Sequence, residues 1–374
     1  MTSSPAAEVA PAASGTLPCA RGPVAWRFAP LPGAAPSFWD AVPPAAGLET
    51  YAKALSPRGA RAPADRLDVR AVDGYRAPEG EPPPAPGGPW ASYTETGTAR
   101  WIHWPARGPS GTAGLVRART GEAADGTGTG PDGGSPTVVE VSASNEAFRR
   151  KLFRMSLIAP LMLGGGVGLV HGVAITRDKV TVLLAGNSGS GKSTLGLAAF
   201  ADGWQVVAED LVFVTSDLSV VPLFLGGAWE NRVQPDDRAL ISRITGTELH
   251  GNASDLPPDH RGREYFFPVR ARGGALPDRV LPIDLVVYVD RSQGASVTGD
   301  GRAGQVLGAG PGSTLGAVAK LLRLDFAPVV READRISRAL VGELPSRRFM
   351  ASGRPEEDVP AFLSSVDRWA RTVG

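Results

Sequence analysis

The chain has almost no cysteine, because Cys19 is the only one among 374 residues. A disulfide within the chain and a cysteine-based metal site are therefore excluded. Histidine is also scarce, and the four residues His103, His171, His250 and His260 are not spaced like zinc ligands. An excess of one charge is missing too, since 39 basic and 38 acidic residues leave a net charge of +1. This balance gives no electrostatic indication of a nucleic-acid partner.

Export and membrane signals are also lacking. Residues 1–20 have neither the charged start nor the apolar core of a signal peptide. The uncharged run 155–176 approaches the length of a membrane span. It is rich in glycine, however, and its last residues form a predicted strand that leads directly into the segment beginning at residue 180. We interpret 146–163 as a buried helix that breaks near Pro160. The sequence thus predicts a cytoplasmic protein with no membrane partner.

Lysine is rare as well, and one of only five lysines stands in the most informative segment of the chain. An apolar strand is predicted over 180–185 and a helix over 194–201, and the residues between them fit G-x-x-x-x-G-K-[ST]. In this strand–loop–helix setting the motif predicts a nucleoside triphosphate site, for ATP or another nucleotide. The candidate nucleotide-binding residues are Gly186, Asn187, Ser188, Gly189, Ser190, Gly191, Lys192, Ser193 and Thr194.

The residue types of this loop explain the prediction. Glycines let backbone N–H groups turn toward phosphate oxygens, and the start of the following helix adds further N–H donors and the positive end of its dipole. Lys192 is expected to reach the β- and γ-phosphates, and the Ser193 hydroxyl is expected to be a Mg²⁺ ligand. We therefore expect ATP and Mg²⁺ as cofactors.

Two adjacent carboxylates follow the predicted helix. Glu209 and Asp210 lie between the apolar runs 204–207 and 211–214, where acids are costly unless a cation or polar ligand meets them. Phosphoryl transfer needs one carboxylate near the metal and one near the attacking hydroxyl. We assign Asp210 to the metal and both acids to catalysis, although the sequence leaves open which one is the base. The alternative is a strand end with two solvated acids.

A histidine lies upstream of the loop. The segment 169–175 reads as a strand that pairs beside the 180–185 strand through a turn at 177–179, which would bring His171 near the phosphates. Because imidazole titrates near neutral pH, His171 is a candidate catalytic residue that shares a proton with the acids or bonds the acceptor. The structural alternative is a buried imidazole bonded to a backbone carbonyl.

In this order, the motifs resemble HPr kinase/phosphorylase and the wider group of HPr-kinase-like P-loop kinases. The matching pieces are His171-Gly172, the loop 186–194, Asp202-Gly203-Trp204 and the acidic pair. Weaker likeness continues at 262–268 and 281–290. The resemblance implies an α/β fold: a P-loop kinase domain of the HPr-kinase/PEP-carboxykinase-like type, with a small β-rich N-terminal accessory domain.

Two departures from the family refine the expected function. The first acid is Glu209 where the family usually has aspartate, and the arginine-glycine signature of HPr kinase/phosphorylase itself has no counterpart here. The resemblance therefore argues against HPr as substrate and implies an ATP-dependent phosphotransferase acting on a hydroxyl, typically serine, of a peptide or small metabolite. The alternative is a nucleotide-binding ATPase or switch with no phosphoryl acceptor. The sequence leaves a homo-oligomer open.

Composition predicts the domain organisation. We expect a disordered tail over 1–20, an accessory domain over 21–145 with mobile loops at 78–89 and 121–136, and a kinase domain over 146–374. The accessory domain should contain strands near 66–72, 100–104, 112–117 and 137–141. Between 228 and 279 we expect mostly loop, with Arg263 as a candidate arginine for the γ-phosphate. Amphipathic helices are expected at 315–324, 332–341 and 359–370.

Overall fold

The protein is a mixed α/β structure. The computed structural model describes residues 13–17, 24–28, 67–71, 92–96, 99–107, 112–120, 137–144, 146–162, 167–222, 231–253, 264–268, 277, 279–291, 314–323 and 327–373. Among these residues it contains two seven-stranded sheets, a three-stranded sheet and six helices.

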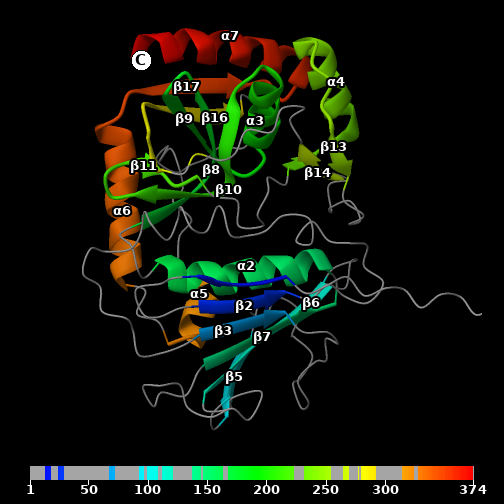
Figure 1. The fold of residues 1–374 in the computed structure, drawn as a ribbon, viewed down its shortest axis with the longest axis vertical. Helices are drawn as coiled ribbons and strands as arrows, with labels where there is room; N and C mark the ends of the chain where they lie inside the picture. Colours follow the sequence, from blue (N-terminus) through cyan, green and yellow to red (C-terminus); the bar gives the residue numbers. More distant parts are fainter. Residues whose placement is uncertain are drawn as a thin grey trace, which may run out of the picture. The chain divides into compact units, whose positions relative to one another are not determined.

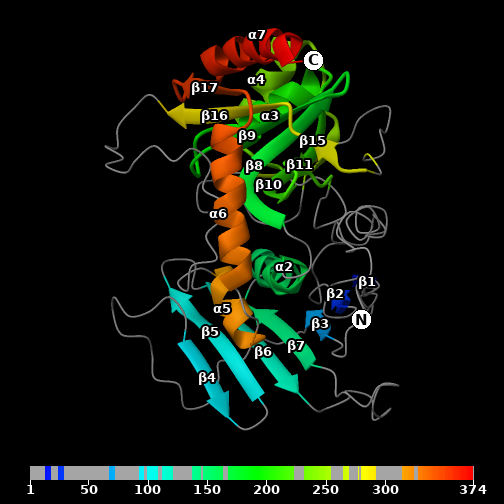
Figure 2. The same ribbon diagram turned by 90° about the vertical axis from the view of Figure 1, so that its left-hand side faces the viewer.

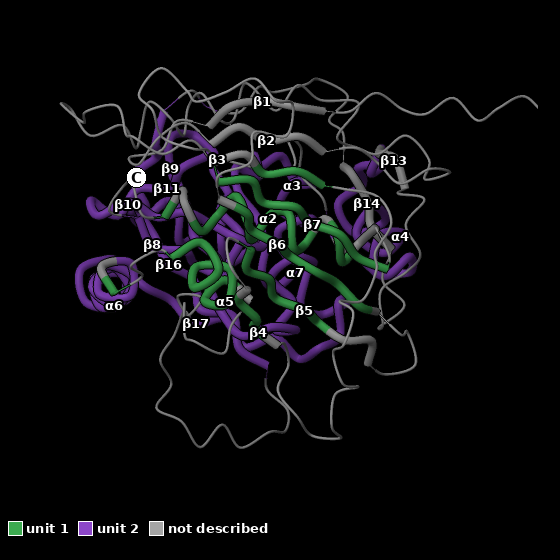
Figure 3. The backbone as a smooth tube through the Cα atoms, turned by 90° about the horizontal axis from the view of Figure 1, so that it is seen from below, with its two compact units in different colours: residues 1–44, 55–165, 309–328 green, residues 45–54, 166–308, 329–374 purple. Residues whose placement is uncertain are grey.

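Contacts divide the chain into two compact units (Figure 3). Unit 1 comprises residues 1–44, 55–165 and 309–328, and unit 2 comprises residues 45–54, 166–308 and 329–374. The chain thus passes from unit 1 to unit 2 and back more than once. The accessory and kinase domains expected from composition stay a prediction, because a contact division does not test which segments fold independently.

Unit 1 is built on a sheet with the strand order β1-β2-β3-β7-β6-β5-β4. Its strands are β1 (Ala13–Leu17), β2 (Val24–Phe28), β3 (Leu67–Ala71), β4 (Ser92–Thr96), β5 (Ala99–Arg107), β6 (Thr112–Thr120) and β7 (Thr137–Ala143). The four strands expected from the sequence are confirmed. β1 lies inside the stretch expected to be a disordered tail, where its backbone pairs antiparallel with β2.

Two helices cover one face of this sheet, as Figure 2 shows: α2 (Glu146–Met162) and α5 (Thr314–Leu321). A Cβ atom at Gly114 of β6 would come within 2.5 Å of Leu152, so glycine is what lets α2 approach the sheet. Trp104 also packs edge-on against Phe148, with ring centroids 6.3 Å apart. The predicted break near Pro160 is wrong, because α2 continues to Met162 and the proline lies in its last turn.

Unit 2 is built on a sheet with the strand order β15-β11-β10-β8-β9-β16-β17 (Figure 1). The strands are β8 (Val167–Arg177), β9 (Val180–Ala185), β10 (Gln205–Thr215), β11 (Ser219–Val220), β15 (Leu281–Pro282), β16 (Leu285–Arg291) and β17 (Ser346–Ala351). β9, β16 and β17 run parallel, and β8 pairs antiparallel with both β9 and β10. The carboxyl ends of β9, β16 and β17 therefore lie at one edge of the sheet.

Both faces of the unit 2 sheet are covered by helices. α3 (Lys192–Ala201), α4 (Pro235–Thr245) and α7 (Pro355–Val373) pack on one face, where side chains of β8, β9 and β16 join their core. α6 (Ala327–Gly342) packs on the other face through Ile336, Ala339 and Leu340. Burial on both faces explains why β9 is buried at all six positions and apolar at each of them except Thr181.

Two expectations for this region are corrected. The section 228–279 contains α4 and the sheet β12-β14-β13, formed by β12 (Asn231–Val233), β13 (Gly251–Ala253) and β14 (Glu264–Pro268). Helix signals were present there, since Pro235 opens α4 and Gly246 ends it in a left-handed conformation. The two apolar runs around the acids are also joined in one strand, β10, which pairs with β8 from Gln205 to Thr215 with a β-bulge between Val206 and Ala208.

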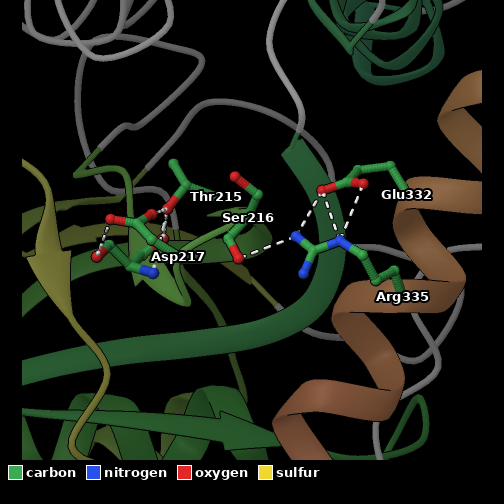
Figure 4. Close-up of polar contacts among 6 residues, drawn as sticks. Thr215, Ser216, Asp217, Glu332 and Arg335 are labelled. Atoms are coloured by element: carbon green, nitrogen blue, oxygen red, sulfur yellow. Dashed lines mark hydrogen bonds and ion pairs between the residues drawn. The ribbon is translucent and has the colours of Figure 1, made fainter.

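A polar side chain connects helix α6 of unit 2 to the turn after β10. In Figure 4, Arg335 of α6 donates to the carbonyl oxygen of Ser216 in the β10–β11 turn (2.9 Å) and pairs with Glu332 (2.7 Å). The same turn is closed by a hydrogen bond from Thr215 to Asp217. These contacts fix the far end of β10. In the described part of the chain, no helix is both long enough and apolar enough to cross a membrane.

Candidate nucleotide-binding site

The glycine-rich loop lies at the carboxyl edge of the unit 2 sheet, between β9 and α3, as predicted. Its first residue, Gly186, lies against β16, and a Cβ atom there would be only 2.3 Å from the carbonyl oxygen of Val289. Only glycine therefore permits this close approach of two backbones. The loop begins where two parallel strands end, which is where ligands bind in open α/β sheets.

The loop turns into α3 through Gly191. This residue is the N-cap of α3 in a left-handed conformation (φ 102°), and no side chain caps the helix. An α-helix leaves its first N–H groups without partners inside the helix, and its dipole places partial positive charge at the same end. The start of α3 therefore has the donor groups and the charge that suit a phosphate.

Lys192 is held inside the loop. Its Nζ donates to the carbonyl oxygens of Asn187 (2.7 Å) and Gly186 (2.9 Å) and lies 3.5 Å from Ser190 Oγ. The residue is only 5% exposed. Burial lowers the pKa of Lys192 to about 8, although the charges of Asp210 and Glu209 act in the opposite direction. Both predicted carboxylates are therefore close enough to the loop lysine to influence its charge.

The strand register explains how the acids reach the loop. Asp210 of β10 pairs with Gly172 of β8, and Gly172 pairs with Ala185, the last residue of β9 before the loop. One rung of the sheet thus joins the acidic pair to the start of the loop across β8. A Cβ atom at Gly172 would lie 2.6 Å from the carbonyl oxygen of Leu184, so this rung requires glycine at its centre.

Asp210 has a left-handed backbone (φ 63°) in the middle of a strand. Its neighbours Ala208 and Val212 pack into the core under α6, so ordinary strand dihedrals would direct the Asp210 side chain into that apolar core. Instead the side chain is 36% exposed. A left-handed non-glycine residue is strained by about 1–3 kcal/mol, and such strain clusters at functional sites. No residue pattern around Asp210 indicates this conformation in advance.

His171 lies next to this acid, as the sequence predicted. Its Nε2 is 3.6 Å from Oδ1 of Asp210, and its side chain is 25% exposed. On β8 it pairs with Leu211, one rung beyond Gly172. His171 is therefore half-buried beside a carboxylate, with its Nε2 just beyond hydrogen-bond distance of Asp210.

Asn231 was missed by the sequence analysis. It opens β12, it is fully buried, and its Nδ2 donates to the carbonyl oxygen of Ser193 (3.1 Å). Its Oδ1 is buried without a hydrogen-bond partner. An unsatisfied buried acceptor costs about 1–3 kcal/mol. A single asparagine before a short strand is not a signal that sequence reasoning can single out.

β16 brings an arginine to the same edge. Val287 and Val289 pack in the core with α3, and Arg291, two residues further along the strand, shares their face and is exposed. The preceding Asp290 forms an ion pair with Arg348 of β17 (3.3 Å). Arg263, the arginine considered from the sequence, lies outside the described residues.

The donors near the loop suit magnesium better than a metal with many protein ligands. Within the described ranges there is no cluster of three or more histidine, cysteine or acidic side chains that would hold a metal ion. Mg²⁺ usually takes one or two carboxylates together with phosphate oxygens and water. Ser193 and Asp210 carry hard oxygen atoms of the kind that Mg²⁺ takes from a protein, so the chemistry of both residues fits the ion.

Comparison with known proteins adds no family to this geometry. No family model matches the chain, and no curated protein is similar to it. The likeness to HPr-kinase-like enzymes therefore rests on the motifs of this sequence alone.

Proposed function

We propose that unit 2 is a Mg²⁺-dependent phosphotransferase that moves the terminal phosphoryl group of ATP or a related nucleotide to a hydroxyl group. One observation carries the proposal. The glycine-rich loop, with Lys192 buried at its centre, lies one sheet rung from a strained, partly exposed carboxylate at Asp210. A loop that only bound phosphate would not need acids beside its lysine, because they repel the ligand.

Each residue has a role in this proposal. The amides of the loop and of the first turn of α3 bind the β- and γ-phosphates, and Lys192 neutralises their charge. Ser193 and Asp210 hold Mg²⁺, which supplies further neutralisation of phosphate charge when bound. Among the described arginines, Arg291 is the candidate to reach the transferring group, because β16 ends beside the loop.

The transfer step follows from these roles. Glu209 accepts the proton of the acceptor hydroxyl, whose oxygen forms a new bond to the γ-phosphorus. The bond between that phosphorus and the β–γ bridging oxygen breaks, and the nucleoside diphosphate leaves with the electron pair. His171, whose Nε2 lies 3.6 Å from Asp210 Oδ1, keeps that carboxylate oriented. A serine of a peptide or a small metabolite is the acceptor class that this chemistry and the motif resemblance favour.

The experiment follows the γ-phosphate itself. Full-length protein is incubated with Mg²⁺ and γ-labelled ATP, first with water alone and then with serine or serine-bearing peptides. We expect label to appear on a hydroxyl acceptor, and only with intact Lys192. Release of inorganic phosphate without any acceptor product would favour the ATPase or switch alternative. No nucleotide binding in calorimetry would reject both readings.

A further inference from the structure

Asn231 connects the three-stranded sheet to the first turn of the loop helix. It begins β12, where its backbone pairs with Phe266 of β14, while its side chain reaches α3. Its Nδ2–H donates to the backbone carbonyl oxygen of Ser193. Ser193 is the residue directly after the loop lysine, Lys192. A side chain anchored in another sheet therefore fixes the position of the residue expected to bind magnesium.

The orientation of the amide is set by this contact. If nitrogen and oxygen exchanged places, Oδ1 would face the carbonyl oxygen of Ser193, and two acceptors would repel each other. Asn231 therefore presents a buried Oδ1 that has no partner in the free protein. Leucine has the same branched side-chain skeleton and carries no unsatisfied polar atom, so the amide is not needed for the packing of the free protein.

We infer that Asn231 is a positioning residue for the magnesium–nucleotide site, acting through Ser193. The inference rests on the proposed function, because it assigns a task in the same site. By holding the Ser193 backbone, Asn231 fixes the direction in which the hydroxyl leaves the first turn of α3. Residues behind a metal ligand orient that ligand, and their loss typically weakens metal binding by about 10- to 100-fold.

The test separates metal dependence from stability. We compare wild type, Asn231→Leu and the control Thr245→Val, which removes a side-chain bond to the carbonyl oxygen of Ile241 in α4 (2.9 Å). Thermal unfolding is measured without nucleotide or metal. Binding of a non-hydrolysable, fluorescent ATP analogue is then titrated with and without Mg²⁺.

We expect Asn231→Leu to unfold at the wild-type temperature or above it, because an unsatisfied acceptor is removed. The Mg²⁺ concentration that this variant needs for tight binding of the ATP analogue should rise at least about tenfold. Its affinity for the analogue without Mg²⁺ should equal that of wild type. The control should match wild type in Mg²⁺ requirement. A wild-type Mg²⁺ requirement in Asn231→Leu, or an equal loss with and without metal, overturns the inference.

Asn231→Asp guards against a folding defect in the leucine variant. It keeps the volume but replaces the donor with a second acceptor facing the Ser193 carbonyl, so the Mg²⁺ requirement should again rise. An aspartate variant with wild-type Mg²⁺ dependence overturns the inference. If wild type itself binds no nucleotide at any Mg²⁺ concentration, the proposed function fails. If wild type binds and the variants behave like it, only the role of Asn231 fails.

Discussion

The two seven-stranded sheets carry different side chains on comparable strands. In unit 2, helices cover both faces, and the loop strand β9 is buried at every position. In unit 1, Trp101 of β5 and Arg117 of β6 lie opposite each other on the sheet face away from α2, and both side chains are half-buried. A sheet with helices on both faces needs apolar strands, and its polar chemistry is confined to strand ends.

Backbone strain differs between the units in the same way. Among the described residues of unit 1, Arg323 is the one non-glycine residue with positive φ, and it follows the end of α5. Asp210 of unit 2 has positive φ inside a strand, between two paired neighbours. A positive φ directly after a helix is common, because the chain changes direction there. Strain within a ladder directs a carboxylate toward the loop, so unit 2 is where we expect chemistry.

The largest effect is expected from the loop lysine. Lys192→Ala should lower phosphoryl transfer by at least about 10³-fold, because it removes the charge that meets the phosphates. The matched control is Lys320→Ala in unit 1, which removes a lysine lying 4.4 Å from the Tyr93 ring centroid. Transfer rates and circular dichroism of both variants are measured. Equal losses of transfer rate in the two variants would contradict our assignment of the chemistry to unit 2.

The acidic pair should give the next largest effect. Glu209→Gln should lower the transfer rate by about 10²–10⁴-fold with nucleotide affinity largely kept, as expected for loss of a general base. Asp210→Asn should weaken Mg²⁺-nucleotide binding. Glu140→Gln serves as the unit 1 control, since Glu140 also lies in a strand and forms an ion pair with Arg119. If both unit 2 variants stay within about threefold of wild type, the pair is a solvated strand segment.

The buried lysine also predicts a pH effect on stability. The folded pKa of about 8 lies below the ordinary 10.5, so the unfolded chain holds this proton more tightly. The charged lysine thus destabilises the folded state below pH 8, and this cost disappears as pH rises from 8 to 10.5. The interval corresponds to at most about 3 kcal/mol. The stability of wild type relative to Lys192→Met should rise across this range in denaturant titrations.

The unit 1 lysine provides the reference for that titration. Lys320 is exposed, and the stability of Lys320→Met is measured over the same pH range as the reference variant of unit 1. A stability difference between wild type and Lys192→Met that does not change with pH would mean that the Lys192 ammonium is solvated in the free protein, contrary to its burial in the loop.

The smallest effect is expected from the histidine. His171→Asn should lower transfer about tenfold, as expected for a residue that orients a catalytic carboxylate, with little change in melting temperature. Its counterpart in unit 1 is His103 on β5, whose replacement should act on stability and not on transfer, because it is buried in a sheet without the loop. A His171→Asn variant that melts early yet transfers normally per folded molecule would make His171 a core residue.

Helices and strands could be predicted where the hydrophobic pattern and the turn residues at the ends of a segment agreed. The strand 180–185, its hairpin with β8 and the helix of the loop were expected and are confirmed. α4 was overlooked because its polar sequence leaves Ile241 as its single fully buried residue and gives little apolar periodicity. The continuity of β10 was not predicted, because Glu209 and Asp210 interrupt its apolar pattern. Its backbone pairing with β8 continues regardless of side-chain polarity.

The sequence by itself determined the loop motif, the acids and the histidine that we assign to the site, because each depends on residue type and short spacing. Only the tertiary structure decided the left-handed Asp210, the burial of Lys192 and the contact from Asn231 to Ser193. These features depend on sheet register and on residues 38 positions apart in the chain. Within a hairpin the hydrophobic pattern and the turn set the register. The contact from Asn231 to Ser193, by contrast, joins two elements that no turn connects, so no local pattern of the sequence indicates it.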